Sequence, residues 1–267
     1  MRASAPAKIN LGLVVGPLRD DGKHELLTVY QRIGIADRID VDDSERLAVD
    51  GFPEDTLVRG ALEALAGATG IEPRWRVRIE KRIPVAAGLG GGSSDAATAL
   101  RLANTTLDDA ALHGIAARIG ADVPFFLREG PQLGSGDGGE LEPLDLPQDY
   151  WVVLLRPRDA RKESTAAVYR AFDERGGEEG WEGRRDAFRA ALHDIRRPRD
   201  LAQLPPNDLA SSQLADRLRD HGAFRADVSG AGPTVFGLFE SDDDAGRAQA
   251  ALRGLGETWI TRPAWYG

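Results

Sequence analysis

Large aliphatic residues occupy every odd-numbered position from Ile9 to Val15 and alternate with Asn10, Gly12 and Val14. This period of two predicts a strand with one well-buried face. Three further apolar runs, separated by Gly and Asp, predict short strands at Leu26–Ile35, Arg38–Val41 and Leu47–Val49. The chain therefore begins with strands.

A helix and another strand follow. Asp55 is a predicted N-cap, and Gly67 and Gly70 are stop signals for the helix. Apolar residues between them recur at helical spacing: Leu57, Val58, Ala61, Leu62 and Leu65. Alternation of apolar and charged residues from Trp75 to Glu80 then predicts a strand that ends at Pro84.

The pattern changes after Tyr150. A buried-type strand, Trp151–Leu155, precedes helical stretches that begin near Ser164, Gly183 and Asn207. The remaining elements are strands at 226–228, 234–239 and 258–261 and a helix at 243–252. Apart from the extra helices, this is the β-α-β-β-α-β order of a ferredoxin-like layer. We therefore expect an α+β protein of two domains, 1–147 and 148–267.

Composition narrows the class of protein. The 267 residues are 42% hydrophobic and 29% charged, which is typical of a globular chain. A formal charge of -9 argues against binding to nucleic acid or to an anionic membrane. No apolar run approaches the ~18 residues of a membrane span. The segment Lys8–Gly16 contains Asn10 and no cleavage site follows it, so we expect no signal peptide.

Cysteine is absent, which excludes disulfides and thiolate chemistry and fits a cytoplasmic location. The four histidines are too scattered for a zinc motif: His24, His113, His193 and His221. We therefore expect a small-molecule ligand rather than a nucleic acid or a membrane. The sequence leaves the oligomeric state and any metal ligands open.

A glycine-rich stretch joins the strand at Trp75–Glu80 to an apolar helix. Glycines expose backbone N–H groups closely to a ligand, and Ser93 or Ser94 can open the helix, so this loop predicts a site for an anion such as a nucleoside triphosphate. A flexible loop with an ordinary serine cap is the alternative. The stretch is neither a Walker A nor a G-x-G-x-x-G motif. Its residues are Pro84, Val85, Ala86, Ala87, Gly88, Leu89, Gly90, Gly91, Gly92, Ser93 and Ser94.

A formal G-x-G-x-x-G occurs at Gly134, Gly136 and Gly139, but the residues after it do not open a helix, so we discount it.

Three other features are ambiguous when taken singly. Lys8 is either a half-buried functional cation or a surface residue that extends its ammonium to water. Asp122 is either a catalytic carboxylate or the cap of a short helix that Pro124 begins. The segment Ser229–Pro233 is either a second backbone approach to phosphate or a hairpin turn.

Together these segments resemble the GHMP kinases, and within them the kinases of 4-diphosphocytidyl-2-C-methyl-D-erythritol in non-mevalonate isoprenoid biosynthesis. The resemblance spans nearly the whole chain, is strongest up to Phe126 and is weak between Arg158 and Pro206. The doubled serine after a triple glycine is its most specific part. The segments that carry it are Pro6–Asn10, Asp20–Leu26, Pro84–Ala97, Gly120–Pro124 and Ser229–Pro233.

The resemblance implies an N-terminal domain like the second domain of a ribosomal protein, a ferredoxin-like C-terminal domain and an active site between them. It implies transfer of the γ-phosphoryl group of ATP, with Mg²⁺, to the 2-hydroxyl of the methylerythritol unit. The ATP loop of the family falls on Pro84–Ser94. Its catalytic pair falls on Lys8 and Asp122, with Asp122 as the base.

The resemblance also implies substrate contacts. Asn10 and His24 match positions that contact the substrate, His24 at the cytosine, and Tyr169 matches an aromatic that stacks on that base. Where the family usually has a second aromatic, this chain has Lys23. Stacking on a base contributes roughly 1 to 3 kcal/mol, so we expect weaker cytidine binding unless Lys23 contacts a phosphate or covers the base with its stem. Gly138–Glu140 also departs from the Gly-x-Gly-Glu spacing of the family.

Two alternatives stay open at this point. Lys23 favours a GHMP-type kinase for another small alcohol. The ribosomal-type domain favours a module that binds a nucleotide or RNA without catalysis, although the net charge opposes the RNA version.

Overall fold

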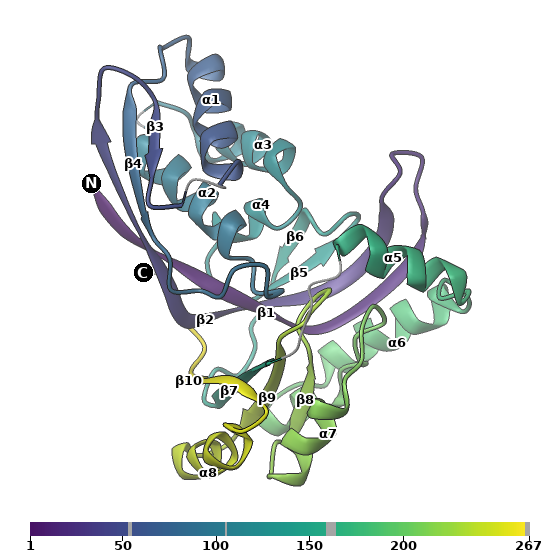
Figure 1. Ribbon diagram of the computed structural model, residues 1–267. Coiled ribbons are helices and arrows are strands. Elements are labelled where there is room, and N and C mark those ends of the chain that lie inside the picture. Colours follow the sequence, from purple (N-terminus) through teal and green to yellow (C-terminus); the bar gives the residue numbers. More distant parts are fainter. Residues whose placement is uncertain (53–54, 105, 159–163, 265–267) are drawn as a thin grey trace. The chain divides into compact units, whose positions relative to one another are not determined.

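The computed structural model describes residues 1–52, 55–104, 106–158 and 164–264 (Figure 1). It divides into two compact units. The first unit contains 1–7, 35–85 and 90–129, and the second contains 8–34, 86–89 and 130–267. The chain changes unit several times because the long strands β1 (Arg2–Leu18) and β2 (His24–Asp43) each contribute to both. The predicted domains are continuous stretches of chain, 1–147 and 148–267, whereas the two units are discontinuous. The boundary between 147 and 148 therefore stays a prediction.

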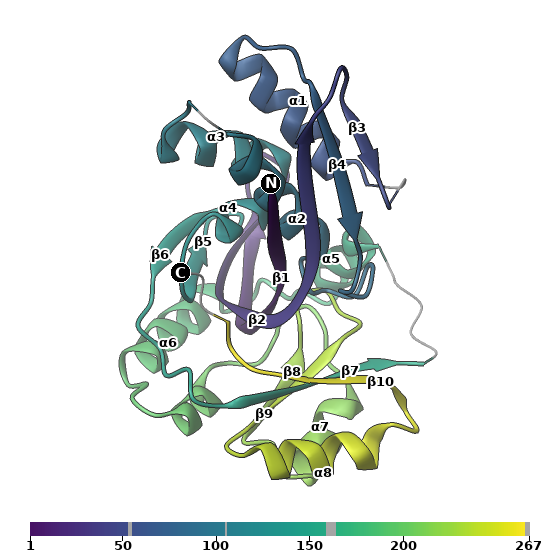
Figure 2. The same ribbon diagram turned by 90° about the vertical axis from the view of Figure 1, so that its left-hand side faces the viewer.

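In the first unit, β3, α1, β4 and α2 match the predicted pattern. β2 pairs antiparallel with β4, which in turn pairs in parallel with β3. Trp75, Val77 and Ile79 are buried while their neighbours are exposed, as the alternation predicts. Helix α1 packs on α2, and α2 packs on β4 (Figure 2). The elements are β3 (Ala48–Asp50), α1 (Leu57–Thr69), β4 (Trp75–Glu80), α2 (Gly91–Ala103), α3 (Asp109–Ile119) and α4 (Val123–Phe126).

The second unit contains a four-stranded antiparallel sheet in the order β10-β7-β9-β8. Numbered along the chain as strands one to four, this order is 4-1-3-2, which confirms the predicted ferredoxin-like layer. Its elements are β7 (Trp151–Pro157), α5 (Thr165–Glu174), α6 (Trp181–His193), η1 (Pro198–Gln203), α7 (Gln213–Asp220), β8 (Arg225–Val228), β9 (Val235–Phe239), α8 (Asp242–Leu252) and β10 (Gly256–Thr261).

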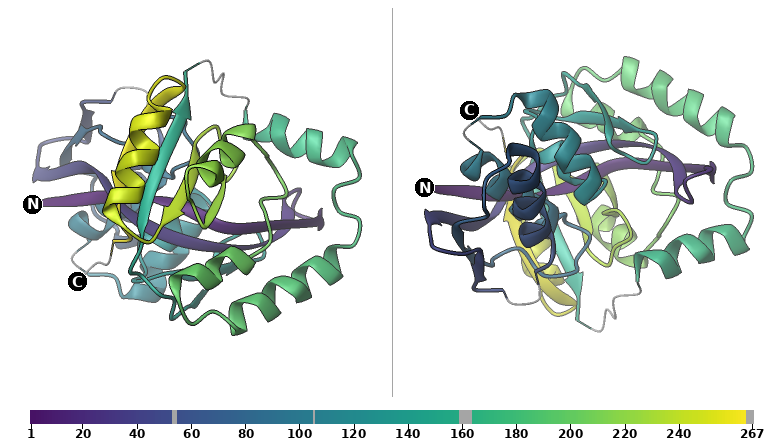
Figure 3. Two further views of the ribbon diagram at one scale, coloured as in Figure 1. Left: turned by 90° about the horizontal axis from the view of Figure 1, so that it is seen from below. Right: turned by 90° about the horizontal axis from the view of Figure 1, so that it is seen from above.

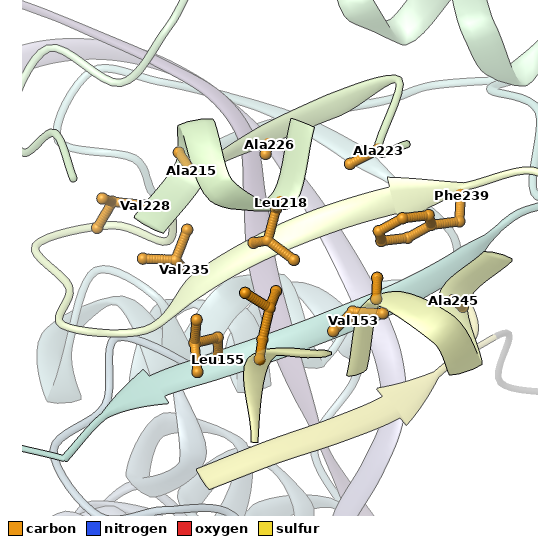
Figure 4. Packing of buried hydrophobic residues seen from close by; sticks show 12 residues of the cluster. Val153, Leu155, Ala215, Leu218, Ala223, Ala226, Val228, Val235, Phe239 and Ala245 are labelled. Carbon is orange, nitrogen blue, oxygen red and sulfur yellow. The ribbon is translucent and has the colours of Figure 1, made fainter. Parts of the chain in front are cut away.

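Helices α7 and α8 cover one face of this sheet (Figure 3). Leu218 of α7 and Ala245 of α8 meet Val153, Val235 and Phe239 from the sheet in one buried cluster (Figure 4). Alternate strand residues supply this cluster because side chains along a strand point to opposite faces. The helices of the ferredoxin-like layer are therefore held by burial of apolar surface.

β1 departs from the expected pattern because both of its faces are buried. On the face that carries Asn10, glycines leave room for aromatic rings of α6. An added Cβ at Gly12 would lie 2.9 Å from Phe188, and one at Gly16 would lie 2.5 Å from Trp181. The glycines of the alternating pattern therefore mark a helix that packs against this face.

Other differences are local. The runs at Leu26–Ile35 and Arg38–Val41 form one strand, β2, rather than two. The helix expected near Asn207 begins at Gln213 instead, with Ser212 as its N-cap, since the Asn207 side chain is engaged in turn contacts.

Helix α3 and the hairpin of β5 (Gln132–Ser135) and β6 (Glu140–Pro143) were not predicted. The formal G-x-G-x-x-G lies in this hairpin, so discounting it was correct.

A buried ion pair supports the turn region near residue 207. The guanidinium of Arg225 lies 3.6 Å from the Asp227 carboxylate, and both side chains are less than a tenth exposed. Arg225 also donates to the carbonyls of Leu204 and Pro205, and Asp227 accepts from the backbone N–H of Asn207. Burial is the main effect on Arg225 and lowers the pKa of its guanidinium to about 10.

Asp227→Ala leaves the buried guanidinium without its counter-charge, so we expect a loss of about 3–5 kcal/mol in the free energy of unfolding. Asp216→Ala is the control, because Asp216 pairs with Arg219 on the surface and is 70% exposed. The control should lose at most about 1 kcal/mol. Urea unfolding of both variants measures the difference, and equal losses would contradict it.

Candidate active site

Lys8 is buried on β1, with 4% of its surface exposed. The surface interpretation of this residue is therefore wrong. Its ammonium donates a 2.6 Å hydrogen bond to Oδ1 of Asn10 and lies 5.4 Å from the ring centroid of Tyr30. An amide oxygen and an aromatic face are the kind of partners that a buried cation requires.

The orientation of Asn10 is fixed from the neighbouring strand. Its Nδ2 donates a 2.8 Å hydrogen bond to Oγ1 of Thr28, and Thr28 donates in turn to the carbonyl of Gly12. Because the Nδ2 group faces Thr28, the amide oxygen faces Lys8. Thr28 and Tyr30 were not selected from the sequence, although their spacing of two places them on the same face of β2.

The middle of the glycine-rich loop, 86–89, lies beside Lys8. The backbone N–H of Lys8 donates to the carbonyl of Leu89 at 2.9 Å, and Oγ of Ser229 donates to the carbonyl of Gly88 at 2.9 Å. The backbone N–H of Thr234 donates to the carbonyl of Ala87. These bonds hold the loop residues to the strand that carries Lys8 and to the segment Ser229–Pro233.

Ser229–Pro233 is a turn that joins β8 to β9, so the hairpin interpretation is correct. It also approaches the buried lysine: an added Cβ at Gly230 would lie 3.2 Å from Oδ1 of Asn10 and 3.6 Å from Nζ of Lys8. Nδ2 of Asn207 donates to the carbonyls of Val228 and Gly230 and so fixes the turn. The sequence pattern predicts a helix start near Asn207 and carries no signal for this role.

The end of the loop becomes helix α2. Gly90 is its N-cap with φ +69°, and the helix begins at Gly91, so neither serine caps it. Ser94 instead lies in the first turns and is fully buried, and its Oγ has no hydrogen-bond partner among the described residues. Exposed backbone N–H groups at a helix N-terminus, together with a buried hydroxyl, can hold an anion.

Asp122 belongs to the first unit, at the N-terminus of the short helix α4. Asp122 is the N-cap residue of this helix, as the capping interpretation predicts, but its side chain makes no capping hydrogen bond. Val123, Phe125 and Phe126 are buried and fix the backbone that carries the half-buried carboxylate. Lys8 belongs to the second unit, so the pairing of Lys8 with Asp122 stays a prediction.

His24 and Tyr169 form an aromatic cluster in the second unit. Their rings stack with centroids 5.0 Å apart, and Phe172 meets the His24 ring edge-on at 5.8 Å. Nε2 of His24 lies 2.7 Å from Oδ1 of Asp173. An ionised carboxylate only accepts, so Nε2 carries the proton of this bond. Asp173 was not identified from the sequence.

Lys23 forms an ion pair with Asp137, which lies in the turn between β5 and β6. That turn contains the glycines whose spacing departs from the family. Lys23 and the turn with altered glycine spacing, which both depart from the family pattern, are therefore in contact. The ammonium of Lys23 and a hydrogen bond from Gly139 lower the pKa of Asp137 although partial burial opposes them.

The described residues contain no group of three or more His, Asp or Glu side chains that could hold a metal ion. None of the helices in the described part of the chain is long and apolar enough to cross a bilayer.

Two family models match this chain, one in its N-terminal half and one in its C-terminal half. The GHMP kinases N terminal domain matches residues 56–130, and the GHMP kinases C terminal domain matches residues 182–258. A 4-diphosphocytidyl-2-C-methyl-D-erythritol kinase of Anaeromyxobacter dehalogenans is 41% identical over 94% of this chain and 84% of its own length. A kinase of the same name from Salinispora arenicola is 38% identical over 95% of this chain and 88% of its own length. The chain belongs to the GHMP kinase family.

Solved structures agree with this assignment. A crystal structure of 4-(cytidine 5'-diphospho)-2C-methyl-D-erythritol kinase has a TM-score of 0.77 and 35% identity, covering 99% of this chain and 100% of that one. A mevalonate kinase structure has the same TM-score of 0.77 at 14% identity, covering 100% of both chains, which shows a shared fold. The predicted two-domain GHMP kinase fold and small-molecule kinase class are confirmed.

Gly88→Ala tests the packing of the GHMP kinase loop. Gly88 has φ +78°, and an added Cβ would lie 2.4 Å from the carbonyl oxygen of Ser229. We expect the loop to shift and the KM for ATP to rise about tenfold or more, which is a change of about 1.4 kcal/mol.

Gly22→Ala is the matched control. Gly22 also has φ +78°, but no atom lies within 4 Å of an added Cβ. It adds the backbone strain of a left-handed alanine without the collision. An equal rise of KM for ATP in both variants would contradict the steric explanation.

Proposed function

We propose that this GHMP kinase phosphorylates the 2-hydroxyl of 4-diphosphocytidyl-2-C-methyl-D-erythritol with ATP, giving the 2-phosphate and ADP in non-mevalonate isoprenoid biosynthesis. The observation that carries the proposal is the buried Lys8–Asn10 pair beside the glycine-rich loop, in a chain 41% identical to a kinase of that name. Relatives that are 36–41% identical to this chain are all named as kinases of this alcohol. Their names give no support to a kinase of another alcohol or to an RNA-binding module. We place the reaction in the cytoplasm, where ATP is available.

In the proposed step the substrate 2-hydroxyl oxygen forms a bond to the γ-phosphorus of ATP, and the bond from that phosphorus to the β,γ-bridging oxygen breaks. The hydroxyl proton passes to the Asp122 carboxylate, and ADP leaves. Lys8 orients the hydroxyl and offsets the negative charge that develops on the transferring group. Phosphoryl transfer depends mainly on such positioning and charge neutralisation.

The loop Pro84–Ser94 supplies the phosphate site. Its backbone N–H groups and the N-terminus of α2 offset the phosphate charge. Mg²⁺ usually binds through phosphate oxygens with one or two protein oxygens, and the unpartnered Oγ of buried Ser94 is suited to that role. When bound, the ion would neutralise phosphate charge.

The cytidine end of the substrate is assigned to the His24 cluster. Tyr169 offers an aromatic face for the base, and Asp173 fixes the tautomer of His24 by accepting from Nε2. Nδ1 of a neutral His24 is then an acceptor, which suits the exocyclic amino group of cytosine. Asn10 contacts the alcohol end, next to Lys8.

The deciding experiment measures ADP release by the purified protein with ATP and Mg²⁺, with and without the cytidine alcohol, and identifies the product by mass. We expect release that depends on this alcohol and a product heavier by one phosphate group. ATP binding without turnover of this alcohol would reject the proposed substrate.

Asp122→Asn and Lys8→Met test the assigned roles. Each removes a charge while keeping the approximate shape of the side chain, so we expect kcat to fall about 100-fold or more. Binding of ATP, measured by calorimetry, should persist. Asp109→Asn is the control, because Asp109 is an exposed carboxylate in the first turn of α3. Near-normal kcat in Asp122→Asn would reject Asp122 as the base.

Lys23→Tyr tests base recognition. An aromatic ring restores stacking of roughly 1–3 kcal/mol, and the ion pair that it replaces is an exposed one of about 1 kcal/mol or less. We expect the KM for the cytidine alcohol to fall about fivefold with kcat unchanged. Asp137→Asn weakens the same ion pair without adding a ring and should leave KM nearly unchanged. A higher KM in Lys23→Tyr would mean that Lys23 itself contacts the substrate.

A further inference from the structure

Three ionisable side chains in the first unit take no part in the proposed reaction. They are Asp37 on β2, Lys81 directly after β4, and Asp95 in α2. Their side chains are 0%, 15% and 1% exposed. Burying charged groups is costly unless they pair with one another, and these three do so.

The lysine joins the two carboxylates. Its ammonium donates to Oδ2 of Asp95 at 2.8 Å and to Oδ2 of Asp37. It also lies 5.6 Å from the ring centroid of Phe52. Lys81 is thereby held on several sides.

The contacts of the network lie at both ends of the glycine-rich loop. Oδ1 of Asp37 accepts the backbone N–H groups of Arg82 and Ile83, the two residues before Pro84. Asp95 directly follows Ser94, the last residue of the loop. The network therefore connects the residues that precede the loop to the residue that follows it. The residues between, 86–89, belong to the second unit and have their own hydrogen bonds there.

The Lys81 ammonium offsets part of the negative charge of the two carboxylates. Burial raises the pKa of Asp95 to about 8, and the negative charge of Asp37 adds to this effect although the Lys81 ammonium opposes it.

We propose that Asp37, Lys81 and Asp95 are positioning residues that clamp both ends of the loop Pro84–Ser94 in the conformation that receives the ATP phosphates. This inference rests on the proposed function, because it assumes that the loop binds ATP. A loop held in place before binding loses less conformational freedom when the nucleotide arrives. The network therefore acts on the affinity for ATP rather than on the alcohol.

Substitutions at Asp95 separate the clamp from simple packing. Asp95→Asn keeps the shape of the side chain and still accepts from Lys81, so its KM for ATP should stay within about threefold of the native value. Asp95→Leu has a similar volume but no acceptor, and Lys81→Met removes the ammonium. Both should raise the KM for ATP about tenfold or more, with little change in the KM for the alcohol.

Leu100→Ala is the stability control. Leu100 is a fully buried residue of α2 that is not part of the network. It should lower the thermal midpoint without raising the KM for ATP. An equal rise in KM in this control, or a native KM in Asp95→Leu and Lys81→Met, would overturn the clamp. Should those two variants fail to fold, Asp37→Asn keeps an acceptor for the backbone amides while removing the charge, and the same rise in KM is expected.

Calorimetric titration of ATP into the native protein and the variants separates the two proposals. Native protein that binds ATP but does not phosphorylate the cytidine alcohol would reject the proposed substrate. The binding constants of the variants would still decide the clamp, because a loss of ATP affinity in Asp95→Leu, but not in Asp95→Asn, supports it without any turnover.

Discussion

The buried ammonium of Lys8 is the constraint around which the second unit is organised. A cation that is 4% exposed needs polar partners, and Asn10 provides one only because Thr28 turns its amide oxygen toward Nζ. The backbone of Lys8 in turn binds Leu89 of the glycine-rich loop. One residue therefore ties the strand pair β1–β2 to the glycine-rich loop, so we expect a change in this strand to alter the loop as well.

Glycines make this arrangement possible at two levels. Within β1, Gly12 and Gly16 allow the rings of Phe188 and Trp181 to cover the face that carries Asn10. In the loop, Gly88 brings its backbone within reach of the Ser229 hydroxyl. The same residue type thus serves packing in the strand and polar contact in the loop, and in both places a side chain would fill the space.

Local signals predicted much of this fold because each has a local physical cause. Alternation predicts β4, and the helix expected near Ser164 begins with that serine as its N-cap. The order of the C-terminal elements predicts the ferredoxin-like layer. Contacts between distant segments have no local sequence pattern that would predict them. Thr28 and Asn207 act on Asn10 and Gly230 across 18 and 23 residues, so only the folded chain identifies them. The role of Asp122 was ambiguous because the residues around it fit the start of a helix. Only the structure shows that its side chain makes no capping hydrogen bond.

The two departures from the family pattern are one structural feature. Lys23 replaces an aromatic residue, and its ammonium pairs with Asp137 in the turn whose glycine spacing is also altered. With the lysine side chain 53% exposed, such a pair contributes at most about 1 kcal/mol, less than the roughly 1–3 kcal/mol of stacking on a base. Stability therefore does not explain the exchange. Since this pair engages Lys23, the proposed recognition of the base depends more heavily on Tyr169 and on His24, whose tautomer Asp173 sets.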